Sequence, residues 1–135
     1  MKQLTCEARL DNLYRVTEFI DRELEALDCP LRAQSQLDVA VDEIFSNICR
    51  YAYAPGTGEA AVQFAFDPET REVSLTFLDR GTPYDPLQRE DPDVSLSAEE
   101  RGEGGLGVFL VKKLMDAVAY RYADGQNQLC MKKKI

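Results

Sequence analysis

Two short segments in the middle of the chain, Ala61–Phe66 and Val73–Leu78, alternate in their apolar residues. Successive side chains of a strand point to opposite faces, so this pattern predicts two β-strands with one face buried. The residues between them, Asp67-Pro68-Glu69-Thr70, are typical of a turn and predict a hairpin. A hairpin with one apolar face requires a sheet that another layer covers on that face.

Helical spacing of apolar residues predicts the covering layer. Three segments show this spacing: about Asn12 to Ala26, roughly Ala33 to Tyr53, and about Leu106 to Asp116. Further strands are expected at residues 3–9 and in a closing hairpin of Val118–Ala123 and Gln128–Lys134. These elements predict an α+β fold, a two-layer sandwich in which helices cover one face of a mainly antiparallel sheet. No repeat or linker divides residues 1–135, so a single domain is expected.

Composition narrows the functions open to such a domain. A formal net charge of −8 makes nucleic acid an unfavourable direct partner. The chain contains no histidine, which excludes histidine-based triads and histidine general bases. Its four cysteines lie far apart without a C-x-x-C pair, so we expect neither a zinc site nor a disulfide framework, and a cytoplasmic location. No apolar run approaches the roughly 18 residues of a membrane span, and the N-terminus does not resemble a signal peptide.

Near the C-terminus, Gly102-Glu103-Gly104-Gly105-Leu106-Gly107 matches the string G-x-G-x-x-G. A dinucleotide-binding fold requires a buried strand directly before the glycines, and the acidic, proline-containing stretch 91–101 is not one. The glycine loop of protein kinases requires later motifs that contain histidine. A P-loop requires lysine after the last glycine, where this chain has Val108. Two interpretations remain: a structural hinge, or a helix start whose backbone amides bind an anion.

Two further patterns place polar residues beside or within a predicted apolar face. On a helix over residues 33–53, Glu43, Asn47 and Arg50 lie together on one flank of the apolar arc. A solvated polar cluster is the alternative interpretation. Strand alternation places Asp79 in the same inward row as Val73, Leu75 and Phe77, where a carboxylate needs a hydrogen-bond donor. An ordinary turn aspartate is the alternative there.

The ordered set of these motifs resembles the Bergerat, or histidine-kinase-like, ATP-binding fold. Its closest resemblance is to the bacterial anti-sigma-factor serine/threonine kinases, and it runs from about Asn12 to the C-terminus. Three segments carry it: LDVAVDEIFSNICRYAY at 37–53, DRGTPYDP at 79–86, and GGLGVFLVKKLMDAV at 104–118.

The resemblance implies a cofactor set of ATP or ADP with Mg²⁺, and a role for each motif residue. Asn47 would ligate Mg²⁺, Glu43 would be the general base, and Arg50 would face the phosphates. Asp79 would accept a hydrogen bond from the adenine amino group, with Gly81 leaving room for the base. The remaining residues would hold the phosphates on backbone amides: Gly102, Gly104, Gly105, Leu106 and Gly107. Residues 87–103 would form a mobile lid.

One departure from the family concerns the last strand, where relatives commonly carry a small hydroxyl residue after a glycine. Here the matching stretch is Gly125-Gln126-Asn127-Gln128-Leu129, and Asn127 or Gln128 would have to substitute.

The resemblance also implies partners: an anti-sigma-factor antagonist that accepts the phosphoryl group, and a sigma factor that is held inactive. A homodimer is a family expectation only. Two alternatives stay open at this point: a catalytically silent nucleotide-binding module of the same fold, and an isolated histidine-kinase catalytic domain. Two features are the reason for the first alternative: the missing hydroxyl residue on the last strand, and an acidic lid with Glu99, Glu100 and Glu103 near the glycines.

Overall fold

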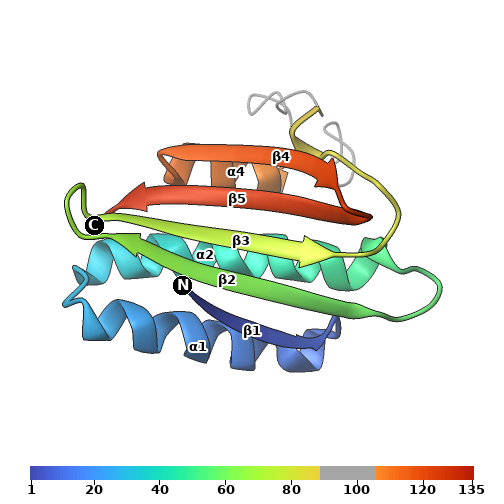
Figure 1. Ribbon diagram of the computed structural model, residues 1–135, viewed down its shortest axis with the longest axis horizontal. Helices are drawn as coiled ribbons and strands as arrows, with labels where there is room; N and C mark the ends of the chain where they lie inside the picture. Colours follow the sequence, from blue (N-terminus) through green and yellow to red (C-terminus); the bar gives the residue numbers. More distant parts are fainter. Residues whose placement is uncertain (89–105) are drawn as a thin grey trace.

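The computed structural model describes residues 1–88 and 106–135, and its main layer is a five-stranded sheet. The strands follow the order β1-β2-β3-β5-β4, and every pairing between neighbours is antiparallel, as predicted (Figure 1). Their bounds are β1 Lys2–Glu7, β2 Glu59–Asp67, β3 Glu72–Asp79, β4 Ala117–Ala123 and β5 Gln126–Lys134. The antiparallel sheet and its helical cover confirm the predicted α+β class.

Helices cover one face of the sheet and lie behind it in Figure 1. Among the described residues the α-helices are α1 Leu13–Ala26, α2 Leu31–Asn47 and α4 Leu106–Leu114, with single 3₁₀ turns at Leu10–Asn12 and Pro86–Gln88. The predicted helix 33–53 begins two residues earlier than expected and changes after Asn47 into a π-helical turn, η2, at Ile48–Ala52. Apolar spacing does not distinguish these two hydrogen-bond patterns. Single π turns are frequent at functional sites.

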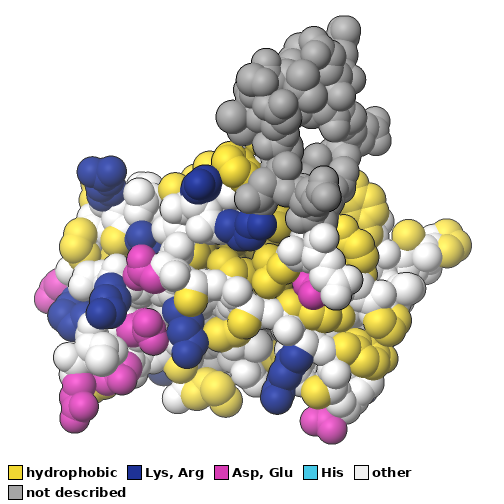
Figure 2. All heavy atoms as spheres, turned by 90° about the horizontal axis from the view of Figure 1, so that it is seen from above, with side chains coloured by type: hydrophobic (Ala, Val, Ile, Leu, Met, Phe, Trp, Pro, Cys, Tyr) yellow, Lys and Arg dark blue, Asp and Glu magenta, His cyan; other side chains and the backbone are white. Residues whose placement is uncertain are grey.

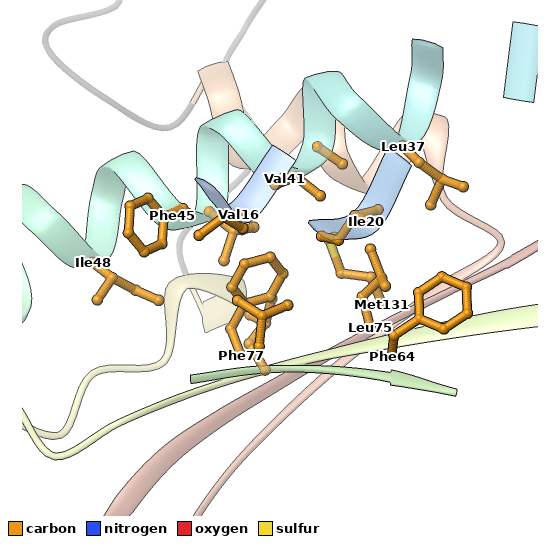
Figure 3. Packing of buried hydrophobic residues seen from close by; sticks show 14 of the residues in the cluster. Val16, Ile20, Leu37, Val41, Phe45, Ile48, Phe64, Leu75, Phe77 and Met131 are labelled. Carbon is orange, nitrogen blue, oxygen red and sulfur yellow. The ribbon is translucent and has the colours of Figure 1, made fainter. Parts of the chain in front are cut away.

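The core lies between the helices and the inward face of the sheet. Side chains of α1 and α2 point towards those of β2, β3 and β5 in Figure 3. The largest side chains that are almost fully buried include Phe45, Phe77, Ile20, Leu24, Leu37, Leu75 and Met131. Burial stabilises the fold by about 1.5–3 kcal/mol for each such side chain relative to leaving it exposed. This packing holds α1 and α2 against the inward face of the sheet.

The closing hairpin confirms the turn predicted at Asp124-Gly125. Both residues have positive φ, 56° and 73°, which is the conformation of a type I′ turn between two strands. Because the hairpin has this tight turn, the register of β4 against β5 is fixed from its closed end.

Hydrophobic and charged side chains are unevenly distributed over the face shown in Figure 2. In Figure 2 charged side chains gather towards the left, and hydrophobic ones are more frequent towards the right. The right-hand end is where β3 ends and α2 leads into the turn before β2 (Figure 1). In the described ranges, no helix has the length and hydropathy to cross a bilayer.

Candidate functional site

A cavity of about 570 Å³ lies between the C-terminal end of α2, the π turn η2, and the ends of β3 and β5. Its size is within the usual range for small-molecule sites. Apolar side chains form most of its wall, among them Ile44, Ile48, Phe77, Val108 and Leu129. A hollow of about 630 Å³ also lies on the outer flank of α1, but one helix alone lines it. The candidate site is the cavity in which several elements converge.

Asp79 is the last residue of β3 and lines this cavity with an exposed fraction of only 6%. Its Oδ1 accepts hydrogen bonds from the backbone N–H of Gly81 and from Asn127 Nδ2, both at 2.9 Å. No group in the described ranges donates to Oδ2. The contact with Gly81 is that of an ordinary turn aspartate, so both interpretations of Asp79 hold in part. The second oxygen is left for a ligand.

Asn127 lies directly opposite Asp79 in the register of β3 and β5 and is also buried. Besides Asp79 Oδ1, its amide nitrogen reaches the carbonyl oxygens of Thr82 (3.1 Å) and Gly81 (3.4 Å). Its amide oxygen accepts from Tyr84 N at 3.1 Å and from Tyr120 Oη at 2.5 Å. Asn127 therefore joins the loop after β3 to β5 and β4.

Of the two candidates for the missing hydroxyl residue, only Asn127 faces the cavity. The side chain of Gln128 accepts from Arg121 Nε at 2.8 Å and donates to the carbonyl of Ala123, away from Asp79. Neighbouring residues of a strand point to opposite faces, which explains the difference.

Three tyrosines that the sequence interpretation did not single out also line the cavity, Tyr51, Tyr84 and Tyr120. Burial raises the pKa of the Tyr120 phenol, so this group stays protonated at neutral pH and donates to Asn127. A signal for Tyr120 was present, because alternation along 118–123 places it on the face of Val118. Tyr84 follows an irregular loop and had no such signal.

The polar flank of α2 reaches the cavity in part. Asn47 lines the cavity, and its side chain makes no hydrogen bond to any residue within 1–88 or 106–135. Arg50 lies in the π turn, is exposed, and is outside the lining, whereas Tyr51 is part of it. The wider π turn changes which residues share the face of Asn47. A phosphate contact by Arg50 therefore stays a prediction.

Glu43 lies one turn before Asn47, and its carboxylate meets the start of α4. A Cβ added to Gly107 would come within 2.0 Å of Glu43 Oε2, so the glycine permits this close approach. Leu106 is the first residue of α4 and is exposed. Gly102, Gly104 and Gly105, together with residues 89–103 of the expected lid, lie outside the described residues.

Gly81 lies against the π turn. A Cβ at this position would come within 2.1 Å of the Ala52 carbonyl oxygen, which also accepts a hydrogen bond from Thr82 N at 2.9 Å. The missing side chain thus lets the chain after β3 approach the end of the helix. The expectation that Gly81 leaves room for a base stays a prediction.

The side chains around the cavity can be compared with those that the expected Mg²⁺ ion requires. Within the described ranges no three or more acidic, cysteine or histidine side chains cluster in a way that would hold a metal ion. Mg²⁺ commonly uses only one or two protein oxygen ligands and takes the rest from phosphates and water. The free amide oxygen of Asn47 at the cavity fits that mode of binding.

Comparison with known proteins gives a family for almost the whole chain and relatives for about three quarters of it. The model of the histidine kinase-like ATPase domain family matches residues 6–133. The chain is 35% identical over 100 residues to the serine/threonine-protein kinase BtrW of Bordetella bronchiseptica, which covers 74% of this chain and 70% of that protein. It is 30% identical over 100 residues to the serine-protein kinase RsbW of Bacillus cereus, covering 71% of this chain and 61% of RsbW. The match therefore spans about three fifths of RsbW. By its fold and by this match, the chain belongs to the histidine kinase-like ATPase family, as a relative of serine/threonine protein kinases.

Proposed function

We propose that this protein binds Mg·ATP in the cavity and transfers the γ-phosphoryl group to a serine or threonine of an anti-sigma-factor antagonist. The observation that carries the proposal is the carboxylate of Asp79. It is buried in a mainly apolar cavity, and one of its oxygens has no donor within the described ranges. This oxygen is open to the cavity, and a ligand that covers it must supply a hydrogen-bond donor in place of water. The adenine amino group is such a donor.

Each side of the cavity then has a role. The apolar wall packs against the base, while Asn47 lies on α2 one turn beyond Glu43 and marks the direction of the phosphates. Mg²⁺ held by Asn47 would supply charge neutralisation at the phosphates. Backbone amides at the start of α4, at Leu106 and Gly107, would bind the phosphates together with Gly102, Gly104 and Gly105. Glu43 would accept the proton of the attacking hydroxyl group, and Arg50 would lie towards the phosphates.

The proposed partners rest on the resemblance to anti-sigma-factor kinases and not on a surface of this chain. A protein of this kind in the cytoplasm would bind a sigma factor and keep it inactive, and phosphorylation of the antagonist would preserve that state. A homodimer belongs to the same proposal.

One contact favours a second candidate, a module that binds nucleotide without turning it over. The carboxylate of Glu43 is pressed against Gly107, where an acceptor hydroxyl would have to approach it. In that case the nucleotide would only set the conformation of a surface for a partner protein.

Transfer of labelled phosphate from ATP onto antagonist proteins encoded beside this gene tests the proposal. We expect wild type to label an antagonist on serine or threonine, and Glu43→Gln to bind ATP with similar affinity but to label it at least a hundredfold more slowly. Asp42→Asn, an exposed neighbour on α2, is the matched control and should transfer normally. ATP binding without transfer by wild type would support the silent module, and no ATP binding would refute both candidates.

A further inference from the structure

The hydrogen bonds of Asn127 leave this side chain no free capacity. A primary amide has two N–H donors and an oxygen with two lone pairs. Its nitrogen faces three acceptors, Asp79 Oδ1, Thr82 O and Gly81 O, and its oxygen faces two donors, Tyr84 N–H and Tyr120 O–H. If the amide were turned over, its oxygen would face these three acceptor oxygens and could form no hydrogen bond with any of them. The direction of the amide is therefore fixed by its surroundings.

This fixed amide determines which part of Asp79 a ligand meets. Both donors, Asn127 Nδ2 and Gly81 N–H, act on the same oxygen, Oδ1. Oδ2 is left over, and a carboxylate oxygen can only accept. Together with Gly81 N–H, Asn127 thus holds the carboxylate in one rotational state and stabilises its negative charge by hydrogen bonding.

The same amide also determines whether Tyr120 can donate a hydrogen bond to a ligand. Because the phenolic hydrogen of Tyr120 is directed to Asn127 Oδ1, the phenolic oxygen can only accept from any further partner. Asp79 and Tyr120 both line the cavity, so the two side chains that Asn127 holds present acceptors and no donor to a ligand. The hydroxyl of Thr82 can rotate and serve as either.

We propose that Asn127 is a positioning residue that sets the hydrogen-bond polarity of the base end of this cavity, so that the site selects a 6-amino over a 6-oxo purine. The inference rests on the proposed nucleotide site and deepens it. Asn127 makes no hydrogen bond to the base, because its own donors and acceptors already have partners. Its effect passes through Asp79 and Tyr120.

Binding of ATP and of inosine triphosphate, which replaces the amino group by an oxo group, tests the proposal by calorimetry. We expect wild type to prefer ATP by about tenfold or more, since a 6-oxo group would leave buried acceptors facing each other. In Asn127→Leu the Tyr120 hydroxyl is released and Asp79 can rotate. The preference should then fall to within about threefold, through weaker ATP binding and unchanged or tighter inosine triphosphate binding. Loss of both affinities by the same factor would show a merely structural role and overturn the proposal.

Gln128→Leu is the matched control. It makes the same change one residue along β5, on the opposite face and away from Asp79, and should keep the wild-type preference. A loss of preference in this control as large as in Asn127→Leu would contradict a specific role of Asn127.

Asp79→Asn gives a second readout in case the leucine variant does not fold. The two donors at the inward position should hold the new carbonyl oxygen there and turn the amide nitrogen to the cavity. The site would then donate, and we expect inosine triphosphate to be preferred over ATP. Unchanged preference for ATP in this variant would overturn the inference, whereas a wild-type protein that binds no nucleotide would refute the proposed function itself.

Discussion

Two glycines of the site are closed in by different kinds of atoms, and this difference predicts different effects of alanine. At Gly81 the obstacle to a Cβ is the backbone carbonyl of Ala52, which the hydrogen bond from Thr82 holds in place. At Gly107 the obstacle is the end of the Glu43 side chain, which can rotate away. We expect Gly81→Ala to lower the free energy of unfolding by about 2 kcal/mol. Gly107→Ala, in the first turn of α4, should be neutral or stabilising by up to about 0.5–1 kcal/mol, because alanine restricts the unfolded chain.

Urea denaturation of the two variants measures this difference. If Gly107→Ala lowers the free energy of unfolding as much as Gly81→Ala, the Glu43 side chain does not rotate away from the new methyl group, and the prediction is wrong. The rate of phosphoryl transfer is the second measurement. Gly107→Ala should displace the Glu43 carboxylate and slow transfer without loss of stability.

A further residue-scale prediction concerns the phenol of Tyr53. Its oxygen accepts from Arg80 N at 2.7 Å, and its hydrogen is donated to the carbonyl of Glu59. The phenol therefore joins the beginning of β2 to the end of β3. Tyr53→Phe should lower the free energy of unfolding by about 1–2 kcal/mol, since two backbone groups lose a partner. Tyr51→Phe, at an exposed position two residues earlier, is the control, and an equal midpoint in urea for both variants would contradict this role.

Single residues were predictable from sequence where a local pattern determined their direction. Strand alternation placed Asp79 on the inward row, and the structure confirms its burial. The hydrogen-bond partner of Asp79 was harder to predict from sequence, because Asn127 is 48 residues away and their contact depends on the pairing of β3 with β5. Local periodicity contains no information on that pairing.

Among the elements, α1 and α2 meet at a pair of carboxylates, Asp21 and Asp38. Oδ1 of each is buried and has no donor within the described ranges, and the two side chains are within hydrogen-bonding reach of each other. Two carboxylates satisfy each other only when one carries a proton. Burial, the hydrogen bond and charge of Asp21, and the charge of Glu25 raise the pKa of Asp38 to about 7.

This pair predicts that the protein loses stability as the pH rises towards neutrality. The folded state holds a proton that the unfolded chain, with an ordinary aspartate pKa near 3.8, releases. Between about pH 4 and 7 the folded state therefore binds more protons, and the free energy of unfolding falls with rising pH. After allowance for solvent screening at a partly exposed pair, we expect this contribution to be about 1–2 kcal/mol.

Asp38→Asn isolates the contribution, because asparagine donates to Asp21 at every pH. Urea unfolding at pH 5 and pH 8 should show a smaller decrease for this variant than for wild type, and higher stability than wild type at pH 8. Asp42→Asn, an exposed carboxylate one turn along α2, is the control. An unchanged pH dependence in Asp38→Asn would show that the two carboxylates do not share a proton.

Element boundaries show where sequence reasoning on the fold was sufficient and where it was not. The described helices and strands agree with the predicted segments to within about two residues at most ends, since apolar spacing and turn residues mark them locally. The π turn after Asn47 was not predicted, because five residues with apolar neighbours fit either hydrogen-bond pattern. Because of this π turn, Arg50 lies outside the cavity lining, whereas α-helical spacing had placed it beside Asn47.

At the scale of the whole molecule, the order of the strands creates the site. β5 is inserted between β3 and β4, although β4 precedes it in the chain. This insertion brings Asn127 beside Asp79 and Tyr120, from three different strands. The sequence predicted a mainly antiparallel sheet but not this order, which depends on contacts between segments far apart in the chain.

Since the cavity lies between α2 and the sheet, a ligand bound there contacts both layers and should stabilise the whole fold. Binding to the folded state alone adds about 2.7 kcal/mol at a ligand concentration of 100 Kd. For a domain of 135 residues, this corresponds to a rise in Tm of about 10 °C. Thermal unfolding with Mg²⁺ and increasing ATP should therefore show a Tm that continues to rise with the logarithm of ATP concentration. Inorganic triphosphate with Mg²⁺ is the control, because it lacks the base that Asp79 would bind; an equal rise with triphosphate would mean that the fold recognises an anion and not an adenine nucleotide.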